Sequence, residues 1–326
     1  MKLLDSHGRR INYLRLSVTD RCNLRCRYCM PKEGIVNKGH DAVLRYEELQ
    51  LIAETAVEIG IEKIRITGGE PLVRAGIVNF LEKLAGIRGL RHLALTTNGI
   101  LLAEMATDLY EAGVQRLNVS LDSLNPQTFS GITSGGDLNK VLAGLDAAEK
   151  AGFPPPKINC VIMRGVNDAE ILDFAEMSRI RGNSIRFIEY MPAMKEDDWQ
   201  RYCISGDEIL KRIAARYTLE QVDKGAFAGP SRDFRIPGAK GSIGIITAVS
   251  GHFCGECNRI RVTSTGQAKG CLFSDTKTDL MPWLRPPDRE GLSGALKRIV
   301  SGKPVGHDIS SKGYTHKNFT MSQIGG

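Results

Sequence analysis

The chain lacks long apolar runs, has few aromatic residues and contains none of the common phosphate-binding loops. No run of eighteen apolar residues occurs, so no membrane span is predicted, and the N-terminus lacks the apolar core of a signal peptide. We therefore expect a cytoplasmic protein without a membrane partner. Aromatic residues make up 6% of the chain, and no block of five Lys or Arg occurs, which disfavours nucleic-acid binding. Neither a Walker loop nor a Gly-x-Gly-x-x-Gly fingerprint is present, so any nucleotide must be held by other groups.

The charge and the cysteines are informative. A formal net charge of +7 over 326 residues suggests an anionic partner, and because the basic residues are scattered, we expect a small polyanion. The 42% hydrophobic content supports one large barrel or two domains. Six of the eight cysteines form two triplets. In a reducing compartment such triplets indicate metal or catalytic ligands rather than disulfides.

The first triplet consists of Cys22, Cys26 and Cys29, directly after an apolar run at 13–18. Three thiolates this close in sequence can hold three irons of a [4Fe-4S] cluster and leave the fourth iron open to a ligand. A structural zinc site is the alternative, but it needs a fourth ligand, and this loop contains no histidine. The spacing therefore favours a cluster.

The second triplet consists of Cys254, Cys257 and Cys271, and His252 keeps a Cys3His zinc site open as an alternative. Arg259 and Arg261 occupy alternate positions of a predicted strand, so they share one face and could bind phosphate together. A solvated basic face is the other interpretation.

Apolar runs and amphipathic helical patterns alternate along the first two hundred residues. Apolar runs occur at 13–18, 63–67, 93–97, 117–121, 158–163 and 185–188, and most of them predict buried parallel strands. One helix should begin after Asp137 and end before Gly152. Six strand–helix units predict a barrel or a doubly wound sheet, with its chemistry at the carboxyl ends of the strands. The cysteine loop follows the first run there.

Other segments carry weaker predictions. Gly68-Gly69-Glu70-Pro71 follows the second run, and its glycines could let the backbone approach a polar ligand, although such a string is more often a plain turn. Residues 224–242 are predicted as a surface loop before a strand at 243–249. Cys160 is expected to be a buried apolar residue, and neither it nor Cys203 is expected to bind a metal.

These motifs together resemble a known family. The first triplet, with Tyr28 before its last cysteine, and the Gly-Gly-Glu-Pro string resemble the signature of radical S-adenosylmethionine enzymes. With the second triplet, the segments 15–20, 63–65, 186–189 and 257–261 and the terminal Gly325-Gly326, the chain resembles the GTP 3′,8-cyclase family of molybdenum cofactor biosynthesis. The resemblance implies an incomplete (βα)6 barrel of the TIM type at 5–200. It also implies a C-terminal region at 201–326 that carries a second cluster and a Gly-Gly tail reaching into the active site.

The resemblance also implies a reaction and its cofactors. Two [4Fe-4S] clusters lie at opposite ends of the barrel, with the substrate between them. S-adenosylmethionine on the first cluster yields a 5′-deoxyadenosyl radical, which takes hydrogen from C3′ of GTP. The carbon radical then adds to C8, and one electron from the reductant and one proton complete the cyclised nucleotide, (8S)-3′,8-cyclo-7,8-dihydroguanosine 5′-triphosphate. The implied partners are GTP, a reductant protein of the flavodoxin or ferredoxin type and a downstream cyclic pyranopterin monophosphate synthase; a homodimer is left open.

Site residues follow from the same resemblance. The cluster ligands are the six triplet cysteines, and His252 is not expected to be one of them. The residues beside S-adenosylmethionine are Tyr28, Gly68, Gly69, Glu70, Ser120 and Met191. The residues at GTP are Arg15, Arg65, Thr96, Lys157, Arg186, Arg259, Ile260 and Arg261, and Arg259 and Arg261 are also expected to contribute to catalysis.

Two alternatives remain at this stage. A peptide-modifying radical S-adenosylmethionine maturase could use the basic residues for another anion, although the spacing of the second triplet and the Gly-Gly end argue against it. A zinc-containing nucleic-acid-binding protein would use both triplets structurally. Iron analysis separates the classes, because two [4Fe-4S] clusters contribute about eight irons per chain.

Overall fold

Strands and helices alternate from the N-terminus as the apolar runs predict. The computed structural model describes residues 2–31, 34, 39–191, 199–223, 229–251 and 254–306. The strands of the alternating part are β1 (Tyr13–Ser17), β2 (Lys63–Thr67), β3 (His92–Thr97), β4 (Arg116–Ser120), β5 (Lys157–Ile162) and β6 (Ser184–Glu189). The helices that follow them are α1 (Tyr46–Glu58), α2 (Ile77–Ala85), α3 (Leu102–Glu111), α4 (Pro126–Thr133), α5 (Leu138–Lys150), α6 (Ile171–Arg181) and α7 (Gly206–Ala214).

The C-terminal region adds further strands to the same sheet. They are β7 (Glu220–Val222), β8 (Arg232–Arg235), β9 (Ser242–Ile246), β10 (Arg259–Val262), β11 (Gln267–Lys269) and β12 (Thr278–Asp279), and helix α8 (Arg289–Ser301) follows. The strand order is β12-β11-β10-β1-β2-β3-β4-β5-β6-β9-β8-β7. All neighbours from β10 to β9 are parallel. Within the described residues, the two end strands, β12 and β7, do not pair with each other, so the sheet forms an incomplete barrel. This confirms the predicted fold class.

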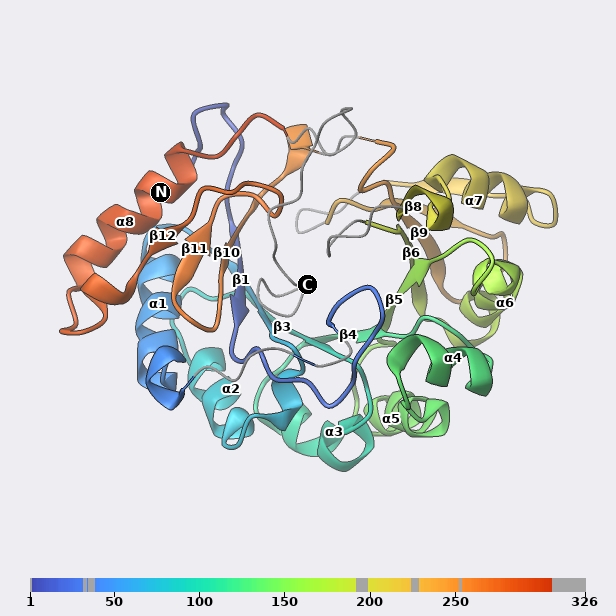
Figure 1. Ribbon diagram of the computed structural model, residues 1–326, viewed down its shortest axis with the longest axis horizontal. Helices are drawn as coiled ribbons and strands as arrows, with labels where there is room; N and C mark the ends of the chain where they lie inside the picture. Colours follow the sequence, from blue (N-terminus) through green and yellow to red (C-terminus); the bar gives the residue numbers. More distant parts are fainter. Residues whose placement is uncertain are drawn as a thin grey trace.

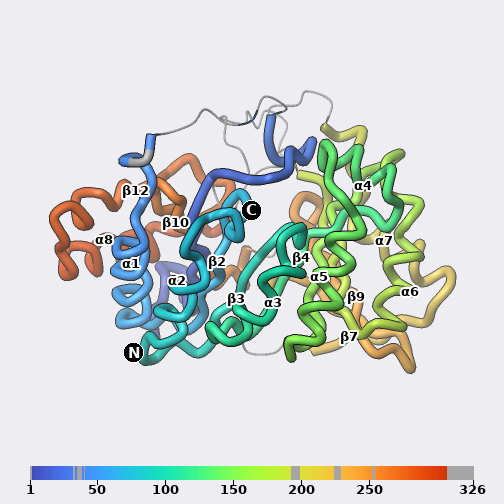
Figure 2. The backbone as a smooth tube through the Cα atoms, turned by 90° about the horizontal axis from the view of Figure 1, so that it is seen from below, coloured from blue at the N-terminus to red at the C-terminus, as the bar shows by residue number. Residues whose placement is uncertain are grey.

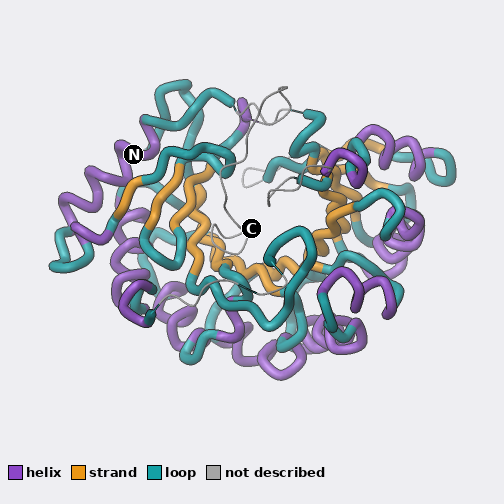
Figure 3. The backbone as a smooth tube through the Cα atoms, in the orientation of Figure 1, coloured by secondary structure: helices purple, strands orange, loops and turns teal. Residues whose placement is uncertain are grey.

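The sheet curves around a central space, and the helices lie on its outer side (Figures 1 and 3). Seen from below, α1, α2, α3, α5 and α6 follow one another around the outside (Figure 2). The alternation of residues in β1 explains this placement. Leu14 and Leu16 are fully buried in the apolar core, whereas Arg15 lines the inner space. Apolar side chains on the outer side of the sheet therefore pack against the helices, and polar side chains face the inner space.

The limits of helix α5 have the predicted physical causes. The Asp137 side chain accepts a hydrogen bond from the backbone N–H of Asn139 at 2.9 Å, which caps the first turn. Beyond the last turn, Gly152 adopts a φ of +100°, a conformation that favours glycine. Both predicted boundaries are confirmed.

Ion pairs attach the C-terminal region to the barrel. Helix α8 packs beside α1, and Arg289 of α8 bonds both Glu54, at 2.6 Å, and Glu58, at 2.5 Å. Arg285 donates two hydrogen bonds to Glu48, whose side chain is 4% exposed. The two regions thus share one sheet and one helical layer, and the domain boundary at residue 200 stays a prediction.

The prediction of a surface loop over 224–242 was wrong in part. Within it, Arg232–Arg235 forms β8, which pairs antiparallel with β9. The segment carries two arginines and an aspartate and has little apolar character, so its strand depends on pairing with β9 rather than on its own propensity. Residues 224–228 lie outside the described part of the chain, as do His252 and the Gly325-Gly326 tail.

Candidate active site

A large cavity occupies the inner side of the barrel. Its lining includes the cysteines of both triplets, the glycines of the Gly-Gly string and inward-facing residues of the parallel strands. The empty space is about 2010 Å³, its open mouth included. Its lining extends from one cysteine triplet to the other, so ligands bound at the two ends would share one space.

The two triplets lie at opposite ends of the cavity. Cys22, Cys26 and Cys29 follow the carboxyl end of β1, whereas Cys254 and Cys257 precede the amino end of β10. Because β10 and β1 are parallel, with Leu14 paired to Ile260, these points lie at opposite edges of the sheet. Cys271 follows β11, which runs antiparallel to β10 and so returns to the second edge. The resemblance predicted this arrangement.

The Gly-Gly string lies against the segment that leads into the first triplet. Gly69 N–H donates to the carbonyl of Thr19 at 2.8 Å, and Glu70 N–H donates to the carbonyl of Arg21 at 2.8 Å. A Cβ on Gly69 would lie 2.3 Å from the Arg21 oxygen, and one on Gly68 would lie 2.7 Å from the Thr19 oxygen. The glycines therefore permit a close approach of their backbone to the segment that leads into the cysteine loop. The sequence alone had suggested only that they let the backbone approach a ligand.

Glu70 connects the loops at this end. Its carboxylate accepts hydrogen bonds from Leu72 N–H at 3.0 Å, from the Thr97 hydroxyl at 2.9 Å and from Asn98 N–H at 2.6 Å. Burial raises the pKa of Glu70 to about 7, and these donors oppose that rise. The Asn98 amide also lies 3.8 Å from the Cys22 sulfur. Glu70 thus fixes the shape of the loops around the first triplet.

Tyr28 and Asp122 form a buried pair beside the first triplet. The Tyr28 hydroxyl donates to Asp122 Oδ2 at 2.7 Å, and Val161 N–H donates to Oδ1 at 2.8 Å. Burial raises the pKa of Asp122 to about 6. Burial and the charge of Cys29 raise the pKa of the Cys26 thiol well above its usual value. Neighbouring thiolates that repel one another in this way become stable when they bind cationic iron.

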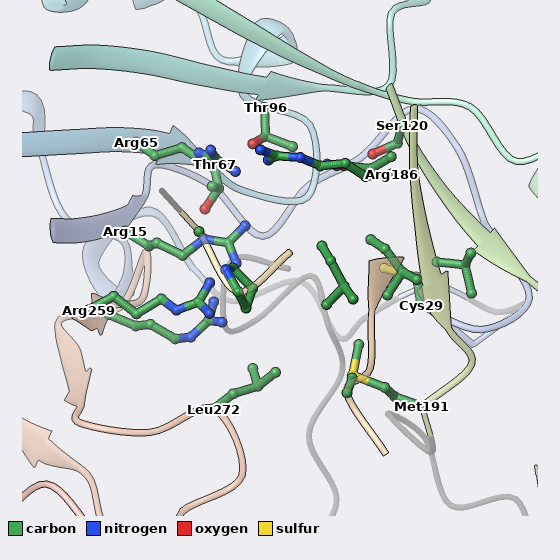
Figure 4. A pocket seen from close by; sticks show the side chains of 18 of the residues that line it. Arg15, Cys29, Arg65, Thr67, Thr96, Ser120, Arg186, Met191, Arg259 and Leu272 are labelled. Carbon is green, nitrogen blue, oxygen red and sulfur yellow. The ribbon is translucent and has the colours of Figure 1, made fainter. Parts of the chain in front are cut away.

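Basic side chains form a ladder across the inner face of the sheet. Arg15 pairs in register with Arg261 on one side and with Arg65 on the other. The cavity lining contains seven basic side chains: Arg15, Lys63, Arg65, Lys157, Arg186, Arg259 and Arg261. Like charges on adjacent strands repel, so a bound anion would stabilise this face. In Figure 4 the guanidinium groups of Arg15 and Arg259 point into the same space, with Cys29 and Met191 on its far side.

Burial and neighbouring positive charges lower the pKa values of basic side chains in this ladder. Burial, followed by the charge of Arg186, lowers the pKa of Lys157 to about 7. Burial and the charge of Arg259 lower the pKa of Arg261 to about 10. Among the described residues, the Nε atom of Arg65 and the hydroxyl of Thr96 are buried without a hydrogen-bond partner. A polyanion with many acceptor oxygens would satisfy both the charges and the donors.

The second triplet has a cationic environment. Burial raises the pKa of Cys257, but the charges of Arg259 and Lys303 outweigh it and lower the pKa to about 7. Within the described ranges, no three His, Cys, Asp or Glu side chains gather as one metal ion would require. Each triplet supplies three thiolates, the number that holds three irons of a [4Fe-4S] cluster.

The cavity brings together every predicted site residue except Ile260. Its side chain is fully buried in the core behind the sheet, because it alternates with Arg259 and Arg261 along β10. The sequence reasoning did not include Lys63 among the site residues, although its spacing of two from Arg65 in a strand was a usable signal. Cys160 is fully buried, as predicted. The Cys203 sulfur lies 3.3 Å from the Tyr190 carbonyl.

Comparison with known proteins defines the class. The model of the radical SAM superfamily matches residues 16–178, and that of the Molybdenum Cofactor Synthesis C family matches residues 183–309. Among solved structures, Streptococcus suis SuiB bound to S-adenosylmethionine is similar over 89% of this chain and 67% of its own, with a TM-score of 0.60 and 14% identity. The chain therefore has the fold and the cysteine loop of a radical S-adenosylmethionine protein.

Relatives in sequence narrow the class. The GTP 3′,8-cyclase of Geobacter sulfurreducens is 63% identical over 326 residues, which cover 100% of both chains. The GTP 3′,8-cyclase of Alkaliphilus oremlandii is 44% identical over 323 residues, which cover 99% of each chain. The chain belongs to the GTP 3′,8-cyclase family. Membership confirms the predicted cofactors, [4Fe-4S] clusters and S-adenosylmethionine. No helix in the described part of the chain is long and apolar enough to cross a membrane.

Proposed function

We propose that this chain converts GTP into (8S)-3′,8-cyclo-7,8-dihydroguanosine 5′-triphosphate, the first step of molybdenum cofactor biosynthesis. The observation that supports this most strongly is one cavity that combines two incomplete cysteine triplets at its ends with a ladder of basic side chains between them. A nucleoside triphosphate would supply an anion with several oxygens for the basic side chains of this ladder to bind.

At the first end, Cys22, Cys26 and Cys29 would bind one cluster through their thiolates. The residues placed around S-adenosylmethionine are Tyr28, Gly68, Gly69, Glu70, Ser120 and Met191, all of which line the cavity. When bound, this cluster and S-adenosylmethionine supply the one-electron chemistry that begins the reaction. The protein's part is to hold the loop rigid, through the Glu70 hydrogen bonds and the Gly69 backbone contact.

In the middle of the cavity, the triphosphate of GTP would bind the basic ladder. The triphosphate would be bound by the side chains of Arg15, Arg65, Lys157, Arg186, Arg259 and Arg261. The Thr96 hydroxyl would donate a hydrogen bond to it. Arg259 and Arg261 would also keep GTP oriented during the reaction, because they lie on the strand between Cys257 and Cys271 of the second triplet. At that end, the thiolates of Cys254, Cys257 and Cys271 would hold the second cluster, which would take part in binding the guanine base. Positioning by several charge-assisted hydrogen bonds lowers the entropic part of the barrier.

The wider setting is also a proposal. The clusters need an external electron, so a reductant protein of the flavodoxin or ferredoxin type is expected, and cyclic pyranopterin monophosphate synthase would consume the product. The thiols of all eight cysteines are free of disulfides, which supports a reducing compartment such as the cytoplasm.

Anaerobic incubation of the reconstituted protein with GTP, S-adenosylmethionine and dithionite tests the proposal. We expect 5′-deoxyadenosine to form only when GTP is present, together with a cyclised nucleotide that retains the triphosphate. Equal amounts of 5′-deoxyadenosine with ATP or with a peptide substrate in place of GTP would contradict the proposal.

A further inference from the structure

Lys303 is a buried charge behind the second triplet. It lies two residues after the end of α8 and is 3% exposed. Its ammonium nitrogen lies 3.6 Å from the Cys257 sulfur, 2.8 Å from the Arg259 carbonyl oxygen and 2.6 Å from the Gly270 carbonyl oxygen. An ammonium group has three N–H donors, so these three acceptors use all of them.

The contacts of Lys303 join the two chain segments that carry the second triplet. Cys257 and Arg259 belong to the first segment, and Gly270 directly precedes Cys271 in the second. Packing at Gly270 is close, since a Cβ there would lie 2.9 Å from the Lys303 side chain. One ammonium group therefore sets the separation between Cys257 and Cys271, which must bind the same cluster.

Arg9 fixes the same region from the N-terminal side. Its guanidinium donates to the Cys254 carbonyl at 2.7 Å and to the Pro304 carbonyl at 2.7 Å, and its Nε atom donates to Asp5 at 2.6 Å. The residue after Lys303 is thus anchored to the remaining cysteine of the triplet. This network leaves the Lys303 ammonium little freedom to move away from the thiols.

We propose that Lys303 is a positioning residue for the second cluster, which holds the two cysteine segments together and raises the reduction potential of that cluster. This inference rests on the proposed function, in which Cys254, Cys257 and Cys271 bind a second cluster. Reduction adds negative charge to the cluster, and a buried cation beside a ligand sulfur stabilises that charge in a medium of low dielectric constant. Hydrogen bonds and charges around ligand sulfurs are known controls of such potentials.

Three variants of the full-length reconstituted protein separate the two roles. Lys303→Gln removes the charge but keeps N–H donors, Lys303→Met removes both, and Lys303→Arg keeps both. Lys297→Met is the matched control, because Lys297 is an exposed lysine on α8, the helix that leads to Lys303. Irons per chain and the midpoint potential of each cluster are measured by iron analysis and potentiometric titration, with the first cluster identified by its response to S-adenosylmethionine.

For Lys303→Gln we expect full iron content and a lower potential for the second cluster only. For Lys303→Met we expect loss of about half of the iron, and for Lys303→Arg and Lys297→Met we expect values like those of the parent. If Lys303→Met does not fold, as judged by circular dichroism, the potential of Lys303→Gln still decides the charge effect. An unchanged second-cluster potential in Lys303→Gln would overturn the proposal. Iron content and potentials are measured without GTP turnover. A negative result for Lys303 would therefore not contradict the proposed reaction, and absence of GTP turnover would not contradict the role of Lys303.

Discussion

Replacing Gly69 by alanine should remove the first cluster and leave the second intact. A Cβ at this position would lie 2.3 Å from the Arg21 carbonyl oxygen and 2.7 Å from that of Asp20. Both atoms are backbone, so no side chain can rotate away. Ordinary contact begins at 3.4 Å, so the two segments must separate by about 1.1 Å.

That displacement acts on the segment directly before Cys22. The pair of backbone hydrogen bonds between Gly69 and Thr19 and between Glu70 and Arg21, both 2.8 Å long, would be stretched. Overpacking of this kind costs roughly 1–3 kcal/mol. Because three thiolates must meet one cluster, a shift of about 1 Å at Cys22 is large compared with the tolerance of roughly 0.2 Å in metal–ligand distances.

Iron and sulfide analysis after anaerobic reconstitution measures the effect. We expect Gly69→Ala to fall from about eight irons per chain toward four. Gly131→Ala is the matched control: nothing lies within 4 Å of its added Cβ, and in helix α4 alanine is favoured over glycine by up to about 1 kcal/mol. A Gly69→Ala protein with eight irons and unchanged S-adenosylmethionine binding would refute the reasoning.

Three further predictions concern other parts of the molecule. Arg259→Ala and Arg261→Ala should each weaken GTP binding by roughly 10- to 100-fold, the equivalent of a charged hydrogen bond, with iron content retained; unchanged affinity in calorimetry for both would remove the phosphate assignment. Although burial raises the pKa of Glu48, hydrogen bonds from Arg285 lower it to about 2, below the ordinary 4.5, so the ionised form stabilises the fold above pH 4.5 and this contribution is lost as the pH falls toward 2. Urea unfolding should therefore show that Glu48→Gln costs about 3 kcal/mol at pH 7 and little near pH 2, and equal costs at both would count against the ion pair. Cys160→Ala should keep about eight irons and lose about 1 kcal/mol of stability, whereas loss of iron would identify Cys160 as a ligand.

The barrel could be predicted because its signals are local. Each apolar run predicts a strand through burial on the helix side, and the ends of α5 follow from Asp137 and Gly152 alone. β8 could not be predicted, since its charged residues gain their strand conformation by pairing with β9. Local propensity predicts an element well only where the conformation depends on the element's own residues rather than on pairing with a distant strand.

The site was predictable in composition but not in arrangement. The two triplets and the basic residues could be read from the chain, whereas the register that aligns Arg261, Arg15 and Arg65 depends on strand pairing between distant segments. The contact of Lys303 with Cys257 joins residues 46 positions apart, and no motif marks it. The direction of Ile260, by contrast, was predictable, because Ile260 alternates with Arg259 and Arg261 along the strand and so faces away from them.

The central claim is that the cavity holds GTP so that its C3′ hydrogen is transferred to the adenosyl group of S-adenosylmethionine. The most direct test uses GTP with deuterium at C3′, in anaerobic incubation with the reconstituted protein, followed by mass spectrometry of the 5′-deoxyadenosine. We expect 5′-deoxyadenosine that carries one deuterium and a cyclised triphosphate that has lost it. Unlabelled 5′-deoxyadenosine, formed alongside GTP that keeps its deuterium, would show that the C3′ hydrogen is not transferred.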